Sequence, residues 1–167
     1  MRIFITGKPG SGKTTLIKKL TSYLVEKDIE VAGFYTAEMR EGKRRTGFQL
    51  TTLPDRQTYL LASQKPPGIP FGRYYVKTEG INKGIQAIKR KADLYIIDEI
   101  GPMEMKNPDF MPVIREVLNS DKNIIAVIHR KLPHIIPEES NIFQLTRENR
   151  EELYEKLKEA VDKHLNM

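Results

Sequence analysis

The chain has 167 residues, 39% of them apolar and 30% charged, so it can bury a sizeable core and is not a disordered chain. It has no cysteine, which excludes disulfides, thiol catalysis and cysteine metal sites and agrees with a cytoplasmic location. Its formal net charge of +6 is scattered, and no apolar run approaches the roughly 20 residues that span a bilayer, so we expect no obligatory nucleic-acid or membrane partner.

Continuous apolar runs predict buried strands, and apolar residues at helical spacing predict the helices between them. The expected strands are residues 2–6, 30–36, 94–97, 123–128 and 141–145. The expected helices are residues 13–27, 81–92, 109–118 and 146–165, the last two with Asp109 and Thr146 as N-caps. Because the first strand starts at once, no signal peptide is expected. This alternation predicts an α/β fold with a mainly parallel sheet and helices on both faces.

Residues 36–76 depart from that alternation. A turn at Glu41-Gly42-Lys43 separates two extended arms, 36–40 and 44–52, which predicts a β-hairpin. Residues 57–62 and 73–76 are further short extended pieces, and the proline-rich segment 64–72 is expected to be a loop. We therefore predict one domain over residues 1–167, with 36–76 as an antiparallel hairpin and loop insertion.

The segment from Gly7 to Thr14 matches G-x-x-x-x-G-K-[ST], the phosphate-binding Walker A motif, between a predicted strand and a predicted helix. Its residues are Gly7, Lys8, Pro9, Gly10, Ser11, Gly12, Lys13 and Thr14. Glycines allow the chain to wrap around an anion so that backbone N–H groups point at it, and the helix start adds a positive field. We expect Lys13 to contact the β- and γ-phosphates, Thr14 to bind Mg²⁺, and Thr15 to reach the α-phosphate.

The apolar strand 94–97 ends in Asp98-Glu99, which has the form of a Walker B element. Asp98 is expected to hold Mg²⁺ through a coordinated water, and Glu99 to activate a water for in-line attack on the γ-phosphate. The alternatives are a capping or loop role for Asp98 and a structural or solvent-facing role for Glu99. His129 follows the next strand and either faces the γ-phosphate or is bonded to backbone, and Arg130 and Lys131 either form a lid or are solvated.

Five strings occur in a characteristic order, and together they resemble the small nucleoside-triphosphatases of thermophilic archaea and bacteria and their human cancer-related relative. They are Gly7–Thr15, Gly33–Thr36, Arg44–Phe48, Asp98–Glu104 and Thr146–Arg150. The absence of cysteine and tryptophan beside many charges also suits a heat-adapted protein. The resemblance implies a P-loop NTPase three-layer fold with another strand between the P-loop strand and the Walker B strand. It also implies slow hydrolysis of ATP, GTP and other nucleoside triphosphates to the diphosphate and phosphate, with broad base tolerance.

The same resemblance adds candidate residues. Gly101 joins the nucleotide-binding residues, and Arg44 or Arg45 of the hairpin becomes an internal arginine finger, unless both only coat the hairpin surface. Three further residues, Thr146, Asn149 and Arg150, are expected beside the base, where the last strand meets the last helix.

Three functions compete on the sequence alone. The first is a standalone Mg²⁺-dependent nucleoside triphosphatase, expected to act as a monomer without nucleic acid. The second is a small-molecule or nucleotide kinase, which shares the same loop, although Glu99 directly after Asp98 favours water as the nucleophile. The third is an ATP-dependent nucleic-acid-binding module, which the basic balance suggests but no RNA-binding motif or aromatic platform supports.

Overall fold

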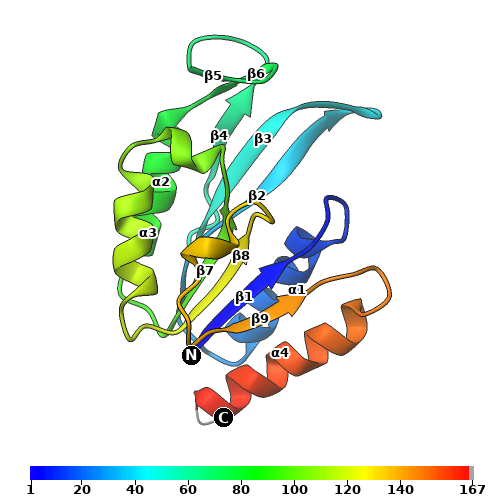
Figure 1. Cartoon of the computed structure of the whole chain (residues 1–167), viewed down its shortest axis with the longest axis vertical. Helices are drawn as coiled ribbons and strands as arrows, with labels where there is room; N and C mark the ends of the chain where they lie inside the picture. Colours follow the sequence, from blue (N-terminus) through cyan, green and yellow to red (C-terminus); the bar gives the residue numbers. More distant parts are fainter. Residues whose placement is uncertain (166–167) are drawn as a thin grey trace.

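The computed structural model describes residues 1–165, and their strands form one continuous sheet (Figure 1). The strands are β1 (Arg2–Thr6), β2 (Val31–Glu41), β3 (Arg44–Leu53), β4 (Thr58–Ser63), β5 (Ile69–Phe71), β6 (Tyr74–Val76), β7 (Leu94–Ile100), β8 (Ile124–Ile128) and β9 (Asn141–Gln144). The helices are α1 (Lys13–Glu26), α2 (Thr78–Ile88), α3 (Phe110–Leu118) and α4 (Arg150–His164), with short 3-10 helices η1 (Glu104–Lys106) and η2 (Pro133–Ile135). None of these described helices is both long and apolar enough to cross a membrane.

The sheet is parallel at one end and antiparallel at the other. Its order is β5-β6-β4-β3-β2-β7-β8-β1-β9. The run from β2 to β9 is parallel, and β3, β4, β6 and β5 continue it in antiparallel pairs. Because β8 lies between β1 and β7, the strand insertion that the family resemblance implied is confirmed.

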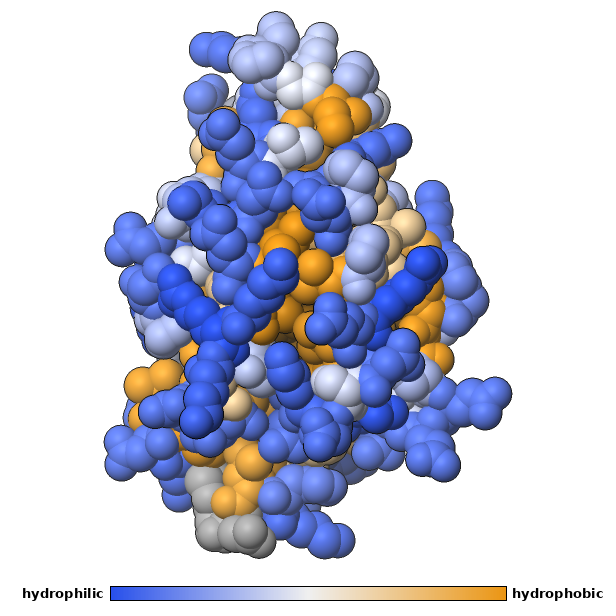
Figure 2. All heavy atoms as spheres, turned by 90° about the vertical axis from the view of Figure 1, so that its left-hand side faces the viewer, coloured by the Kyte–Doolittle hydropathy of each residue, from blue (hydrophilic) through white to orange (hydrophobic). Residues whose placement is uncertain are grey.

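Alternation of side chains along each strand creates two cores, one on each face of the sheet. In β1, Phe4 faces a cluster that also takes in α2 and α3, whereas Ile3 and Ile5 face a cluster with α1 and α4. The helices therefore cover both faces, as predicted (Figure 1). The outer face over α2 and α3 is largely hydrophilic, with apolar atoms in a recessed strip in its middle (Figure 2).

The antiparallel end differs from the expected appendage. β2 is one continuous strand that pairs with β7 through Val31–Phe34 and with β3 along most of its length, so the hairpin extends the central sheet directly. The proline-rich segment 64–72, expected to be a loop, contains β5, which pairs with β6. Pro70 is tolerated there because β5 is the edge strand and needs donors on one side only.

Of the two expected helix caps, the one at Thr146 is wrong and the one at Asp109 is confirmed in position. α4 begins at Arg150 with Asn149 at the N-cap position, because Thr146 and Asn149 bond each other in a turn just before the helix. Asp109 does occupy the N-cap position of α3, but its side chain makes no capping hydrogen bond. The helix expected at 81–92 starts earlier, at Thr78, and ends at Ile88.

Candidate active site

The glycine-rich loop links β1 to α1 and wraps as its sequence predicts. Gly10 and Gly12 have φ of 79° and 98°, in the left-handed region that favours glycine. The ammonium of Lys13 lies over the loop and donates to the carbonyl oxygens of Gly7 at 2.8 Å and Lys8 at 3.1 Å. The loop and the first turn of α1 therefore form a concave, basic surface with N–H donors, which suits a polyphosphate.

A hydroxyl and a carboxylate meet at the end of this loop, although they are far apart in the sequence. Thr14 Oγ1 donates to Asp98 Oδ2 at 3.1 Å and lies 3.1 Å from the carbonyl oxygen of Thr36. Burial, with the charge of Glu99, raises the pKa of Asp98 to about 7. These are hard oxygen donors, and a divalent cation would offset the cost of burying Asp98, so the residues fit Mg²⁺.

Glu99 lies inside β7, not one residue beyond its end as the sequence suggested. The strand continues to Ile100 because Ile100 pairs with Ile128 and accepts a hydrogen bond from the His129 N–H. The pairing register between β7 and β8 shifts between Asp98 and Ile100, so Glu99 is left out of the pairing with β8. Burial raises the pKa of Glu99 against the opposing charge of Lys13.

A third carboxyl group, Glu104, lies beside Glu99 and was not among the predicted site residues. Its residue is buried, and its Oε2 has no hydrogen-bond partner among the described residues. Burial and the charge of Glu99 raise its pKa well above the ordinary value. Gly101 makes room for this pair, because an added Cβ would lie 2.8 Å from Glu99 Oε1 and 3.0 Å from Glu104 Oε2. The only signal in the sequence was the position of Glu104 in the Asp98–Glu104 string.

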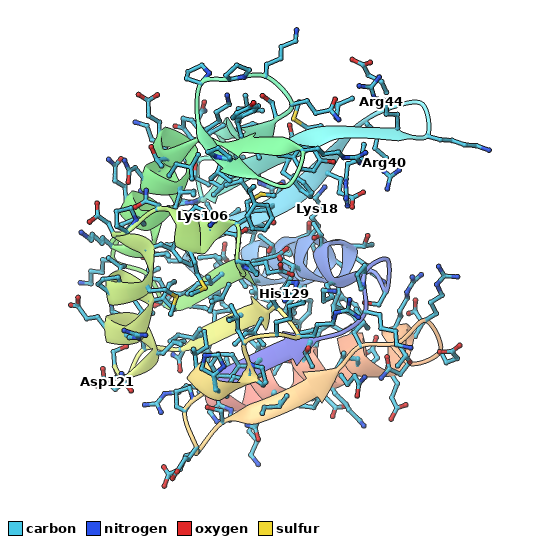
Figure 3. The ribbon with its side chains drawn as sticks, turned by 45° about the horizontal axis from the view of Figure 1, so that its top comes forward. Lys18, Arg40, Arg44, Lys106, Asp121 and His129 are labelled. Atoms are coloured by element: carbon cyan, nitrogen blue, oxygen red, sulfur yellow. The ribbon has the colours of Figure 1, made fainter. Side chains whose placement is uncertain are left out.

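One cavity of about 1070 Å³ joins the loop, the acidic strand end and the hairpin. It brings together most of the residues expected from the two motifs, together with Lys18 and Arg40, which the sequence did not indicate (Figure 3). The predicted residues that line it are Gly7, Pro9, Gly10, Gly12, Lys13, Thr14, Thr15, Asp98, Glu99, Arg45, His129, Arg130, Lys131 and Arg150.

Two cationic segments approach the loop from its flanks. Arg150 at the start of α4 donates through Nε to the Ser11 carbonyl oxygen at 2.9 Å. On the other side, His129 Nδ1 accepts a hydrogen bond from the Lys131 N–H at 3.1 Å, so neutral His129 carries its proton on Nε2. Burial and the charges of Lys131, Arg130 and Lys13 lower the pKa of His129.

Several expected residues lie outside the cavity lining. Arg44 donates instead to Gln64 Oε1 at 2.9 Å near the tip of the hairpin, where Figure 3 labels it. Neighbouring residues of a strand face opposite sides, so Arg45 lines the cavity and Arg44 does not. The other predicted residues outside the lining are Lys8, Ser11, Gly101, Thr146 and Asn149.

Comparisons with known proteins agree on one family. The family model described as NTPase matches residues 2–158. The chain is 44% identical over 161 residues to nucleoside-triphosphatase THEP1 of Methanocaldococcus jannaschii, covering 94% of this chain and 95% of that protein. It is 38% identical to the Thermotoga maritima protein of the same name, covering 92% of this chain and 91% of that protein.

Two solved structures have the same fold. THEP1 from Aquifex aeolicus matches with a TM-score of 0.80 at 30% identity, covering 94% of this chain and 96% of that chain. A human cancer-related nucleoside triphosphatase also matches with a TM-score of 0.80, at 29% identity, covering 97% of each chain.

Proposed function

We propose, from the premise that this chain belongs to the NTPase family and is a nucleoside-triphosphatase, that it hydrolyses ATP, GTP and other nucleoside triphosphates to the diphosphate and phosphate. We further propose that the reaction requires Mg²⁺ and tolerates different bases. The observation that carries this is the contact of Thr14 with Asp98, residues from two motifs 84 positions apart, beside the Lys13 loop.

The binding step would use the loop and its lysine. Backbone N–H groups between Gly7 and Thr14 surround the phosphates, and Lys13, freed from its loop carbonyls, moves to the β- and γ-phosphates. Thr14 and Asp98 would hold the Mg²⁺, Asp98 through a coordinated water. Bound Mg²⁺ supplies charge neutralisation at the β- and γ-phosphate oxygens. Phosphate oxygens and water would supply most of the ligands of Mg²⁺, so few protein oxygens are needed. The proximity of Thr14 and Asp98 supports this assignment, because the two side chains can provide those oxygens together.

The water-activating step is assigned to Glu99. Burial raises the pKa of Glu99, which makes its carboxylate a better proton acceptor than that of an exposed glutamate, and the charge of Lys13 opposes that shift. Neutral His129 can donate from Nε2 to the γ-phosphate, and Arg130 and Lys131 can cover it. Among the hairpin arginines, Arg45 keeps the proposed transition-state role, because it lines the cavity.

The nucleotide end is assigned to the start of α4. Arg150 contacts the Ser11 carbonyl beside the loop, so its guanidinium is available near the α-phosphate or the ribose. Thr146 and Asn149 hold that turn in place through their mutual hydrogen bonds and are proposed to shape the base site without reading the base. Such a site would admit different bases, in line with the base tolerance that we propose.

Phosphate release tests the proposal. Release should occur with ATP, GTP, CTP and UTP at rates of the same order, should stop after exhaustive chelation, and should return with Mg²⁺ or Mn²⁺. Lys13→Ala should nearly abolish it, because a charge at the β- and γ-phosphates is lost. Circular dichroism would show that this variant is folded. Turnover that persists without divalent metal, or in folded Lys13→Ala, would contradict the assignment.

A further inference from the structure

The cavity continues past the place where the γ-phosphate would lie. Its far part is lined by Phe48 of β3, Leu61 of β4, Phe71 of β5 and Met103 before η1, a group that we call the distal chamber. None of these residues belongs to the phosphate loop or the acidic pair. Thr36, which contacts Thr14, is in β2, and β3 and β4 lie about 5 and 10 Å further along the sheet. The triphosphate therefore does not fill this chamber.

Hydrolysis alone does not need this space. The attacking water needs only about 30 Å³. The cavity that contains both the triphosphate site and the distal chamber measures about 1070 Å³, at the upper end of pockets that hold one drug-sized ligand. Phe48, Phe71 and Met103 are only partly buried, whereas Leu61 is fully buried in the core beneath them. Three partly buried apolar side chains from three separate segments of one cavity thus suggest an apolar occupant.

Each of the two aromatic rings carries a cation over it. Arg45 Cζ, in the cavity lining, lies 5.2 Å from the centroid of Phe48, and Nζ of Lys106, an exposed residue just outside the lining, lies 5.9 Å from the centroid of Phe71. Arg45 is oriented by Tyr74 Oη at 3.0 Å and Glu38 Oε1 at 3.1 Å. Figure 3 labels Lys106 at this end of the sheet, apart from Arg44 at the hairpin tip. A ring with a cation above it suits an aromatic ligand that carries an anionic group.

The charge of the whole cavity agrees with that chemistry. Seven basic side chains line it, against four carboxyl groups. This excess is greater than the net charge of a magnesium-bound triphosphate, so a second anion is favoured after the nucleotide has bound.

We propose that the distal chamber binds a second small molecule, a planar aromatic compound with a phosphate or carboxylate group, while a nucleoside triphosphate occupies the phosphate loop. The proposal rests on the proposed function only for the position of the triphosphate. The aromatic body packs among Phe48, Leu61, Phe71 and Met103, and the anionic group lies near Arg45 and Lys106. The ligand then faces the γ-phosphate from the side opposite the nucleotide.

Titration with defined probes tests this site. The protein, saturated with Mg²⁺ and a non-hydrolysable ATP analogue, is titrated calorimetrically with 1-naphthyl phosphate and with 1-naphthoate. Inorganic phosphate and neutral 1-naphthol serve as the half-probes. One or both naphthyl anions should bind, about tenfold or more tighter than either half-probe, because each half-probe lacks one of the two contacts. The tighter anion identifies which acidic group the site prefers.

Three variants locate the binding. Phe71→Ser and Lys106→Gln should each weaken the preferred probe by about tenfold, whereas Leu60→Ser, at an exposed apolar position outside the lining, should not. Without probe, all three variants should release phosphate at close to the wild-type rate. If the wild-type protein itself released no phosphate, that result would contradict the proposed function instead. Equal probe affinity in all variants, competition between the probe and the ATP analogue, or no binding of either anion would overturn the second site.

Discussion

Gly101→Ala tests how the position of the Glu99 carboxylate affects the rate, because it moves the carboxylate without changing its chemical identity. The added Cβ would meet Glu99 Oε1 at 2.8 Å and Glu104 Oε2 at 3.0 Å, where ordinary contacts begin at 3.4 Å. The Glu99 carboxylate must therefore move by about 0.6 Å. Since a misplacement of about 1 Å costs roughly 10²-fold in rate, we expect kcat to fall by about 10- to 10²-fold. Affinity for the triphosphate should change little, because the phosphate contacts remain.

The same geometry predicts a small effect on stability. The atoms that must move are the ends of two side chains, and Gly101 does not have a positive φ, so alanine fits its backbone. The free energy of unfolding should fall by about 1 kcal/mol. Gly42→Ala is the matched control: it has nothing within 4 Å of the added Cβ but a φ of 62°. It should lose about 1 kcal/mol with unchanged kcat.

The assay combines steady-state phosphate release, a fluorescent-nucleotide titration and chemical denaturation of wild type and both glycine variants. The expected pattern is a kcat defect confined to Gly101→Ala and similar stability losses in the two variants. We infer that the close approach of the Glu99 and Glu104 carboxyl groups to Gly101 determines the rate. A wild-type kcat in Gly101→Ala would refute this inference.

Three further predictions follow from the site. Glu99→Gln should keep triphosphate affinity within a few-fold and lower turnover by roughly 10²- to 10⁴-fold; loss of affinity and turnover together would mark Glu99 as a metal or structural residue. The raised pKa of Glu104 means that the folded state retains a proton that the unfolded chain releases above its ordinary pKa of 4.5. Wild type should therefore lose stability relative to Glu104→Gln as pH rises from about 4 to 8 in denaturant titrations, and parallel pH profiles would refute this. RNA or DNA at near-physiological salt should leave phosphate release within about twofold, and a large stimulation would favour a nucleic-acid-dependent enzyme.

Local motifs were predictable because a few consecutive residues encode them. The Gly7–Thr14 loop needs left-handed glycines, and Gly10 and Gly12 are at the positions that adopt them. An apolar run that ends in an acidic residue predicts a buried strand with a carboxylate near its carboxyl end, and Asp98 lies two residues before the end of β7. Helix and strand alternation likewise predicted a sheet covered on both faces, because hydrophobic spacing reports which side of an element is buried.

Other features depended on long-range pairing. The sequence suggested that Glu99 lies beyond the end of its strand, but pairing of Ile100 with Ile128 extends β7 past it. In the sequence, Pro70 favoured a loop, but in the structure its segment pairs with β6 and forms an edge strand. Neither pairing is visible in a local window, because each partner lies on another segment of the chain.

The sequence by itself determined the chemistry of the phosphate loop and the identity of Asp98 as its acidic partner, since backbone conformation and strand burial there follow from local residue types. Only the tertiary structure decided that Arg45, and not Arg44, enters the cavity, because the register of β3 between β2 and β4 sets which face each side chain takes. It also decided that Glu104 is buried beside Glu99 and that Phe48 and Phe71 line one chamber. Such proximity arises from the packing of separate elements, which no short segment of sequence specifies.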